Sequence, residues 1–119
     1  MTTNSTGSIL VVDDEVELKN VLVEALTSQG YKASGFTSGE DALAALREEA
    51  FDVVLTDLMK PAMDGITLVR SALEIDPHLV AIVMTGQGTI QTAVDAMKVG
   101  AFDYVLKPFR LQTVLPVLT

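Results

Sequence analysis

Short apolar runs alternate along this chain with longer stripes of apolar residues. The runs have the length of β-strands and occupy residues 9–12, 32–36, 51–57, 80–84 and 104–106. Between them, apolar residues recur at the three- and four-residue spacing of one helix face. These stripes predict four helices with the following inward residues: Leu18, Val21, Leu22, Ala25 and Leu26; Leu43 and Leu46; Leu68, Val69, Ala72 and Leu73; Ile90, Ala93, Val94 and Met97.

Local signals predict where these helices begin and end. Gly30 and Gly100 follow the first and fourth stripes, and glycine often ends a helix because it adopts a positive φ without strain. Pro77 closes the third stripe, since proline lacks the N–H that a helix needs. Thr37 and Glu40 have the three-residue spacing of a capping box, so we expect Thr37 to begin the second helix.

The last residues of the chain predict only part of a fifth helix. Their apolar residues have helical spacing, but Pro116 lies inside the stripe and cannot donate a backbone hydrogen bond. The chain ends about two turns after the stripe begins. We therefore expect a short or truncated fifth helix and a sequence excised from a longer protein. The stripe consists of Leu111, Val114, Leu115 and Leu118.

Strands that alternate with helices predict an α/β fold. Successive right-handed crossovers give a parallel sheet with helices on both faces. A chain of 119 residues fits one domain, which we place at residues 8–119. Residues 1–7 have little to bury and are expected to form a flexible N-terminal tail.

Composition and charge exclude several classes of function. The chain has 8 Lys and Arg residues against 16 Asp and Glu residues, and its formal net charge of -8 repels nucleic-acid phosphates. It has no cysteine for a disulfide or a thiolate metal site. The apolar runs are too short to cross a membrane, and no apolar leader opens the sequence. We expect a soluble, cytoplasmic protein that binds neither nucleic acid nor membrane directly.

Polar side chains follow the predicted strands at the edge where such folds bind their ligands. Asp13 and Asp14 follow the first strand, Asp57 ends the third, Thr85 follows the fourth, and Lys107 follows the fifth. Three carboxylates at one place repel one another unless a cation joins them, and a hard ion such as Mg²⁺ prefers carboxylate oxygens, water and phosphate. A hydroxyl and an ammonium opposite the acids would suit an anion. The edge therefore predicts phosphoryl chemistry on a carboxylate.

These residues belong to a set of motifs that resembles the receiver domain of two-component response regulators. The resemblance extends from about residue 8 to the end of the chain, and the motifs occur in the family's order and spacing. It implies a flavodoxin-like sheet of five parallel strands in the order 2-1-3-4-5. The motifs are Val12-Asp13-Asp14-Glu15, Asp57 with Pro61, Met63-Asp64-Gly65, Met84-Thr85-Gly86, and Tyr104 with Lys107-Pro108-Phe109.

The resemblance implies a phosphorylation-dependent signalling switch. Asp57 would accept a phosphoryl group from a phosphohistidine on a sensor histidine kinase or a histidine phosphotransfer protein. Mg²⁺ would be held by Asp14, Asp57 and the Met59 backbone carbonyl, with Asp13 acting through water. An output domain or a downstream partner would then respond to the change. A homodimer is among the assemblies that the resemblance suggests.

The resemblance also assigns the remaining site residues. Thr85 and Lys107 would bind phosphoryl oxygens. Thr85 and Tyr104 would form the switch, which reshapes the surface of the fourth helix, fifth strand and fifth helix. The loops that hold the site would be shaped by Pro61, Gly65 and Pro108.

Several simpler interpretations apply to the same residues. Taken alone, Asp13 and Asp14 fit helix-capping acids, because acids favour the first turn. Tyr104 also fits a core aromatic. Lys60 stands where the family usually has methionine; it fits either a solvated loop lysine or a charge that perturbs the acids.

Two other classes of function remain alternatives. One is a small Mg²⁺-dependent phosphohydrolase with an aspartyl nucleophile. Such enzymes commonly place a general acid two residues after the nucleophile, where this chain has Met59. The other is a domain that only binds partners, which the intact set of acids, Thr85 and Lys107 disfavours. We therefore expect a regulatory domain and not a turnover enzyme.

Overall fold

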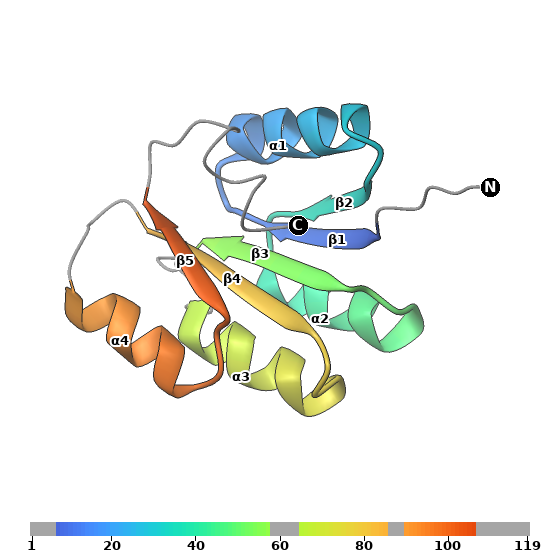
Figure 1. Cartoon of the computed structure of the whole chain (residues 1–119). Coiled ribbons are helices and arrows are strands. Elements are labelled where there is room, and N and C mark those ends of the chain that lie inside the picture. The colour runs from blue at the N-terminus through green and yellow to red at the C-terminus, as the bar shows by residue number, and fades with distance from the viewer. Residues whose placement is uncertain (1–6, 58–64, 86–89, 107–119) are drawn as a thin grey trace.

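The computed structural model describes residues 7–57, 65–85 and 90–106. Strands and helices alternate through these residues, as the apolar pattern predicts (Figure 1). The elements are β1 (Ser8–Val12), α1 (Val16–Ser28), β2 (Lys32–Phe36), α2 (Gly39–Glu48), β3 (Val53–Asp57), α3 (Gly65–Ile75), β4 (Val80–Thr85), α4 (Ile90–Lys98) and β5 (Asp103–Leu106).

The strands form one five-stranded sheet in the order β2-β1-β3-β4-β5, and every pair is parallel. This confirms the order that the resemblance implied. Helix α1 covers one face of the sheet, while α2, α3 and α4 cover the other (Figure 1). The predicted fifth helix lies outside the described residues. Within the part of the chain that is described, no helix is both long and apolar enough to cross a membrane.

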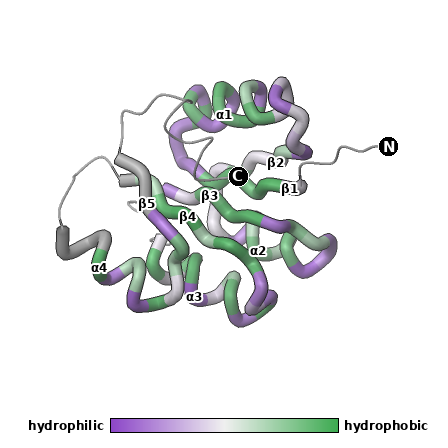
Figure 2. Tube along the Cα trace, viewed as in Figure 1, coloured by the Kyte–Doolittle hydropathy of each residue, from purple (hydrophilic) through white to green (hydrophobic). Residues whose placement is uncertain are grey.

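Alternate side chains of the central strands β1, β3 and β4 enter two separate apolar layers. Side chains on the face of α2, α3 and α4 are those of Leu10, Val12, Val54, Ala81 and Val83. Side chains on the face of α1 are those of Ile9, Val11, Leu55, Ile82 and Met84. Both faces of these three central strands are therefore buried, which explains why β1, β3 and β4 are largely apolar in Figure 2. A slip of one residue would exchange the two layers, so the packing fixes which residues reach each strand end.

Single positions on two helices differ from the sequence prediction. Val21 of α1 is 60 % exposed, and Val94 and Met97 of α4 are 39 % and 41 % exposed, so these three do not face the core. In α1 the predicted inward residues Leu22 and Leu26 are buried, and Leu18 packs against the same layer. In α4 the described core residue is Ala96, which lies about 160° around the helix from Val94.

The start of α2 also differs from the prediction. The residue that caps the helix is Ser38, not Thr37, and its Oγ accepts a hydrogen bond from the Asp41 N–H at 3.3 Å. Ser38 has the extended backbone that a cap requires and stands three residues before Asp41. The two glycine stops are confirmed, since Gly30 and Gly100 have φ of 97° and 111°.

Two neighbouring substitutions test the rotation of α1. Leu22→Ala should lower the free energy of unfolding by about 2 to 5 kcal/mol, because it opens a cavity in the layer beneath the helix. Val21→Ala should change it by less than about 0.5 kcal/mol, because the side chain is exposed. Urea denaturation followed by circular dichroism measures both. Equal losses for the two variants would contradict the orientation described here.

Candidate functional site

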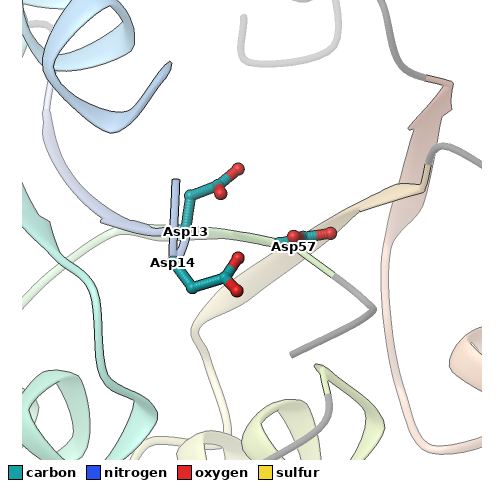
Figure 3. A group of neighbouring side chains, drawn as sticks. All are labelled: Asp13, Asp14 and Asp57. Atoms are coloured by element: carbon teal, nitrogen blue, oxygen red, sulfur yellow. The ribbon is translucent and has the colours of Figure 1, made fainter. Parts of the chain in front are cut away.

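Three aspartates meet at the carboxyl edge of the sheet. Asp13 and Asp14 directly follow β1, and Asp57 is the last residue of the adjacent strand β3. The parallel register pairs Val12 with Thr56, so the next residue of each strand begins the cluster. One carboxylate oxygen from each aspartate can be chosen so that all three lie within 4.8 Å of one another (Figure 3). The structure thus brings together the three acids that the sequence placed at this edge.

The cluster combines buried and exposed acids. Asp13 and Asp57 are buried, whereas Asp14 is exposed to solvent. Two like charges separated by about 5 Å repel by roughly 3 kcal/mol at an effective dielectric constant of about 20. Burial of charge also costs free energy unless it is paired or coordinates a metal. The arrangement therefore favours a bound cation, which the exposed side of Asp14 allows to enter.

Backbone hydrogen bonds hold Asp13 at the end of β1. Its N–H donates to the Phe36 carbonyl of β2 at 3.0 Å, and its Oδ1 accepts the Glu15 N–H at 2.9 Å. Glu15 is the residue from which α1 begins. The helix-capping interpretation does not hold for Asp13, because the N-cap of α1 is Glu15 and no side chain of the described residues caps this helix. The Asp13 carboxylate instead organises the turn before α1 and belongs to the acid cluster.

The acid cluster has the composition of a site for a hard divalent cation. All three ligand candidates are carboxylates, and Mg²⁺ prefers one or two carboxylates together with several waters. Two buried acids give the site fixed geometry, and one exposed acid leaves room for water on the open side. The described residues therefore fit Mg²⁺.

Other predicted site residues lie at or near the same edge. The backbone of Thr85 ends β4, one residue beyond the Met84 that pairs with Asp57. Tyr104 lies in β5, and Gly65 is the buried first residue of α3. Outside the described residues are Met59, Lys60, Pro61, Lys107 and Pro108. Their predicted roles, and those of the Thr85 and Tyr104 side chains, stay predictions.

Thr56 is a feature of the site that the sequence analysis missed, because it treated this residue as part of an apolar strand. Its hydroxyl is buried and donates a hydrogen bond to the backbone carbonyl of Asp57 at 3.1 Å. The available signal was a hydroxyl within an otherwise apolar run, directly before the acid at the strand end.

Comparison with known proteins places the chain in a family. The model of the response regulator receiver domain matches residues 9–119. The transcriptional regulatory protein ZraR of Salmonella typhimurium is 42 % identical over 110 residues, which cover 90 % of this chain and 25 % of that protein. The chain thus spans about a quarter of the length of this curated relative.

Solved structures give the same result for the fold. A response regulator protein from Burkholderia pseudomallei, solved with a phosphorylated aspartic acid, a calcium ion and citrate, matches with a TM-score of 0.88. It is 29 % identical, and the match covers 94 % of this chain and 66 % of that one. The beryllofluoride-activated NtrC4 receiver domain dimer also matches with a TM-score of 0.88. It is 33 % identical, and the match covers 93 % of this chain and 92 % of that one. This chain belongs to the family of response regulator receiver domains.

Proposed function

We propose that this chain is a phosphorylation-dependent signalling switch whose phosphoacceptor is Asp57. The donor is a phosphohistidine of a sensor histidine kinase or of a histidine phosphotransfer protein. The observation that carries the proposal is the cluster of Asp13, Asp14 and Asp57, whose ligand atoms lie within 4.8 Å of one another at the carboxyl edge of a receiver fold. The chain acts as a regulatory domain.

In the proposed reaction, a carboxylate oxygen of Asp57 attacks the phosphorus of the phosphohistidine. A new O–P bond forms, the N–P bond breaks, and the departing imidazole keeps the electron pair and takes up a proton. The product is an acyl phosphate on Asp57. The end of β3 presents the nucleophile at a fixed position beside Asp13 and Asp14. The entropy cost of orienting the nucleophile therefore adds little to the activation free energy.

Mg²⁺ is the proposed cofactor. Asp14, Asp57 and the Met59 backbone carbonyl would hold the ion, and Asp13 would act through water. When bound, the ion supplies charge neutralisation between the acids and the incoming phosphoryl oxygens. Support comes from the three-acid cluster and from the similar Burkholderia pseudomallei protein, which was solved with a phosphorylated aspartic acid and a calcium ion.

The switch residues in the proposal are Thr85 and Tyr104, with Lys107 as the second phosphoryl-binding group. Thr85 and Lys107 would each bind a phosphoryl oxygen, and the Tyr104 ring would move as Thr85 is drawn inward. Pro61, Gly65 and Pro108 would shape the surrounding loops. The backbone positions support this assignment, because Thr85 lies on β4, which pairs with β3, and Tyr104 lies on β5, which pairs with β4.

Exposed apolar side chains on α4 and directly before β5 support assembly after phosphorylation. Val94 and Met97 of α4 are exposed, and so is Phe102, which directly precedes β5. The similar NtrC4 receiver domain was solved as an activated dimer. We propose a homodimer through this surface, and an output domain or downstream partner that responds to it, as in a transcriptional regulator of the ZraR kind.

The aspartyl phosphohydrolase remains the alternative function. It would form the same acyl phosphate but would then release phosphate from many ester molecules in turn. Such turnover needs a general acid near the leaving group, and the position two residues after Asp57 is Met59. The composition of the site thus favours a single, stoichiometric transfer.

Incubation with acetyl phosphate and Mg²⁺ tests the proposal. The intact mass should increase by one phosphoryl group, because a small acyl phosphate can replace the phosphohistidine donor. The increase should be lost when a chelator removes the divalent ion, because the charge of the acid cluster then opposes the donor. No mass increase in Mg²⁺ would overturn the proposal, and sustained hydrolysis of phosphate esters would favour the hydrolase.

A further inference from the structure

Thr56 places a hydroxyl in an apolar layer of the protein. Among the described residues, the buried polar or charged side chains are those of Asp13, Thr56 and Asp57. The two aspartates form part of the acid cluster, but Thr56 cannot, because neighbouring residues of a strand point to opposite faces. Its hydroxyl therefore needs an explanation of its own.

The surroundings of Thr56 would suit valine at least as well. In the sheet, Thr56 pairs with Val12 of β1 and with Val83 of β4, and both valines belong to the layer beneath α2, α3 and α4. Threonine and valine have the same branched shape, but a hydroxyl must lose its water to be buried. Packing alone gives no reason for a hydroxyl at this position.

The hydroxyl has a partner in the backbone of the neighbouring acid. Thr56 Oγ1 donates to the carbonyl oxygen of Asp57 at 3.1 Å, and both residues are buried. That carbonyl belongs to the last peptide group of β3, where the sheet ends. The bond thus restrains the backbone directly after the Cα atom that carries the Asp57 carboxylate.

We infer that Thr56 is a positioning residue for the phosphoacceptor; the inference rests on the proposed function of Asp57. The Thr56 side chain is fixed in the apolar layer between two strands, and its hydroxyl ties the end of β3 to that layer. The restraint holds the Asp57 carboxylate in register with Asp13 and Asp14, so the metal ligands and the nucleophile keep one geometry. Small displacements of a nucleophile reduce rates strongly, and groups behind a metal ligand commonly tune its affinity.

Two substitutions separate positioning from packing. Thr56→Val keeps the branched shape and removes the hydroxyl, so it should unfold close to the parent temperature, because relief of the buried hydroxyl's desolvation offsets the loss of one hydrogen bond. Its rate of phosphorylation by acetyl phosphate, followed by intact mass, should fall about threefold to tenfold, with a comparable rise in the Mg²⁺ concentration needed for half-maximal rate. Thr56→Ser keeps the hydroxyl and loses a methyl group; it should unfold at a lower temperature and be phosphorylated within about twofold of the parent rate.

The two measurements must therefore rank the variants in opposite orders. Thr56→Val should have the higher unfolding temperature, and Thr56→Ser should have the higher rate of phosphorylation. A residue that only packs would give the same order in both, with the valine variant at least as active as the parent, and this result would overturn the inference. Failure of the proposed function looks different, because the parent chain itself would then take up no phosphoryl group. In that case the positioning role is tested by titration calorimetry, which measures the Mg²⁺ affinity of the parent and of Thr56→Val. A weaker affinity of the variant would support the role, and equal affinities would overturn it.

Discussion

Asp57→Asn should abolish phosphoryl uptake, with a rate at least about a hundredfold below that of the parent chain. The amide has nearly the same shape as the carboxylate, so the fold at the end of β3 should be kept. It lacks the anionic oxygen that attacks phosphorus, and it supplies one negative charge fewer to the metal. Intact mass after incubation with acetyl phosphate and Mg²⁺ measures the effect.

The chain provides a matched control for this substitution at the opposite end of the same strand. Asp52 precedes β3 and accepts the Ser8 N–H through Oδ2 at 2.8 Å, at the edge of the sheet away from the acid cluster. Asp52→Asn keeps an oxygen acceptor for that hydrogen bond and should be phosphorylated at the parent rate. Uptake of a phosphoryl group by Asp57→Asn at the parent rate would show that another residue is the acceptor.

Asp14→Asn should weaken Mg²⁺ binding by about tenfold or more while leaving the fold intact. Asp14 is the exposed member of the cluster, so its side chain contributes little to the packing of the fold. Its carboxylate is one of the three candidate ligands, so losing its charge should weaken metal binding. The effect can be read from stability, because an ion that binds only the folded chain stabilises it. At a concentration a hundredfold above the dissociation constant this gain is about 2.7 kcal/mol, and a tenfold loss of affinity reduces it to about 1.4 kcal/mol.

Chemical denaturation at several Mg²⁺ concentrations measures this difference, and circular dichroism suits a chain without tryptophan. Asp41→Asn is the control, because Asp41 is an exposed acid in the first turn of α2, away from the cluster. It should leave the gain from Mg²⁺ unchanged. An Asp14→Asn variant that Mg²⁺ stabilises as much as the parent would exclude Asp14 from the metal site.

The sequence by itself determined the order of the elements and the edge at which the chemistry lies. Apolar runs of strand length that alternate with helical stripes favour the strands of a covered parallel sheet, and such strands deliver the residues after them to one edge. For this reason the sequence predicts that Asp13, Asp14 and Asp57 lie together, and the structure brings one carboxylate oxygen of each within 4.8 Å of the others. The family resemblance supplied the strand order, which residue spacing alone leaves open.

Tertiary structure alone decided the finer choices. The apolar stripes of α1 and α4 are wider than the surface that the sheet can cover, so local spacing could not show that Val21 and Val94 lie outside. Thr37 and Ser38 compete for one helix start, and the path of the chain from β2 selects Ser38. Thr56 shows the same limit at the site itself. A hydroxyl directly before the acid is visible in the sequence, but its hydrogen bond to the Asp57 carbonyl depends on the backbone conformation at the end of β3, which the tertiary structure sets.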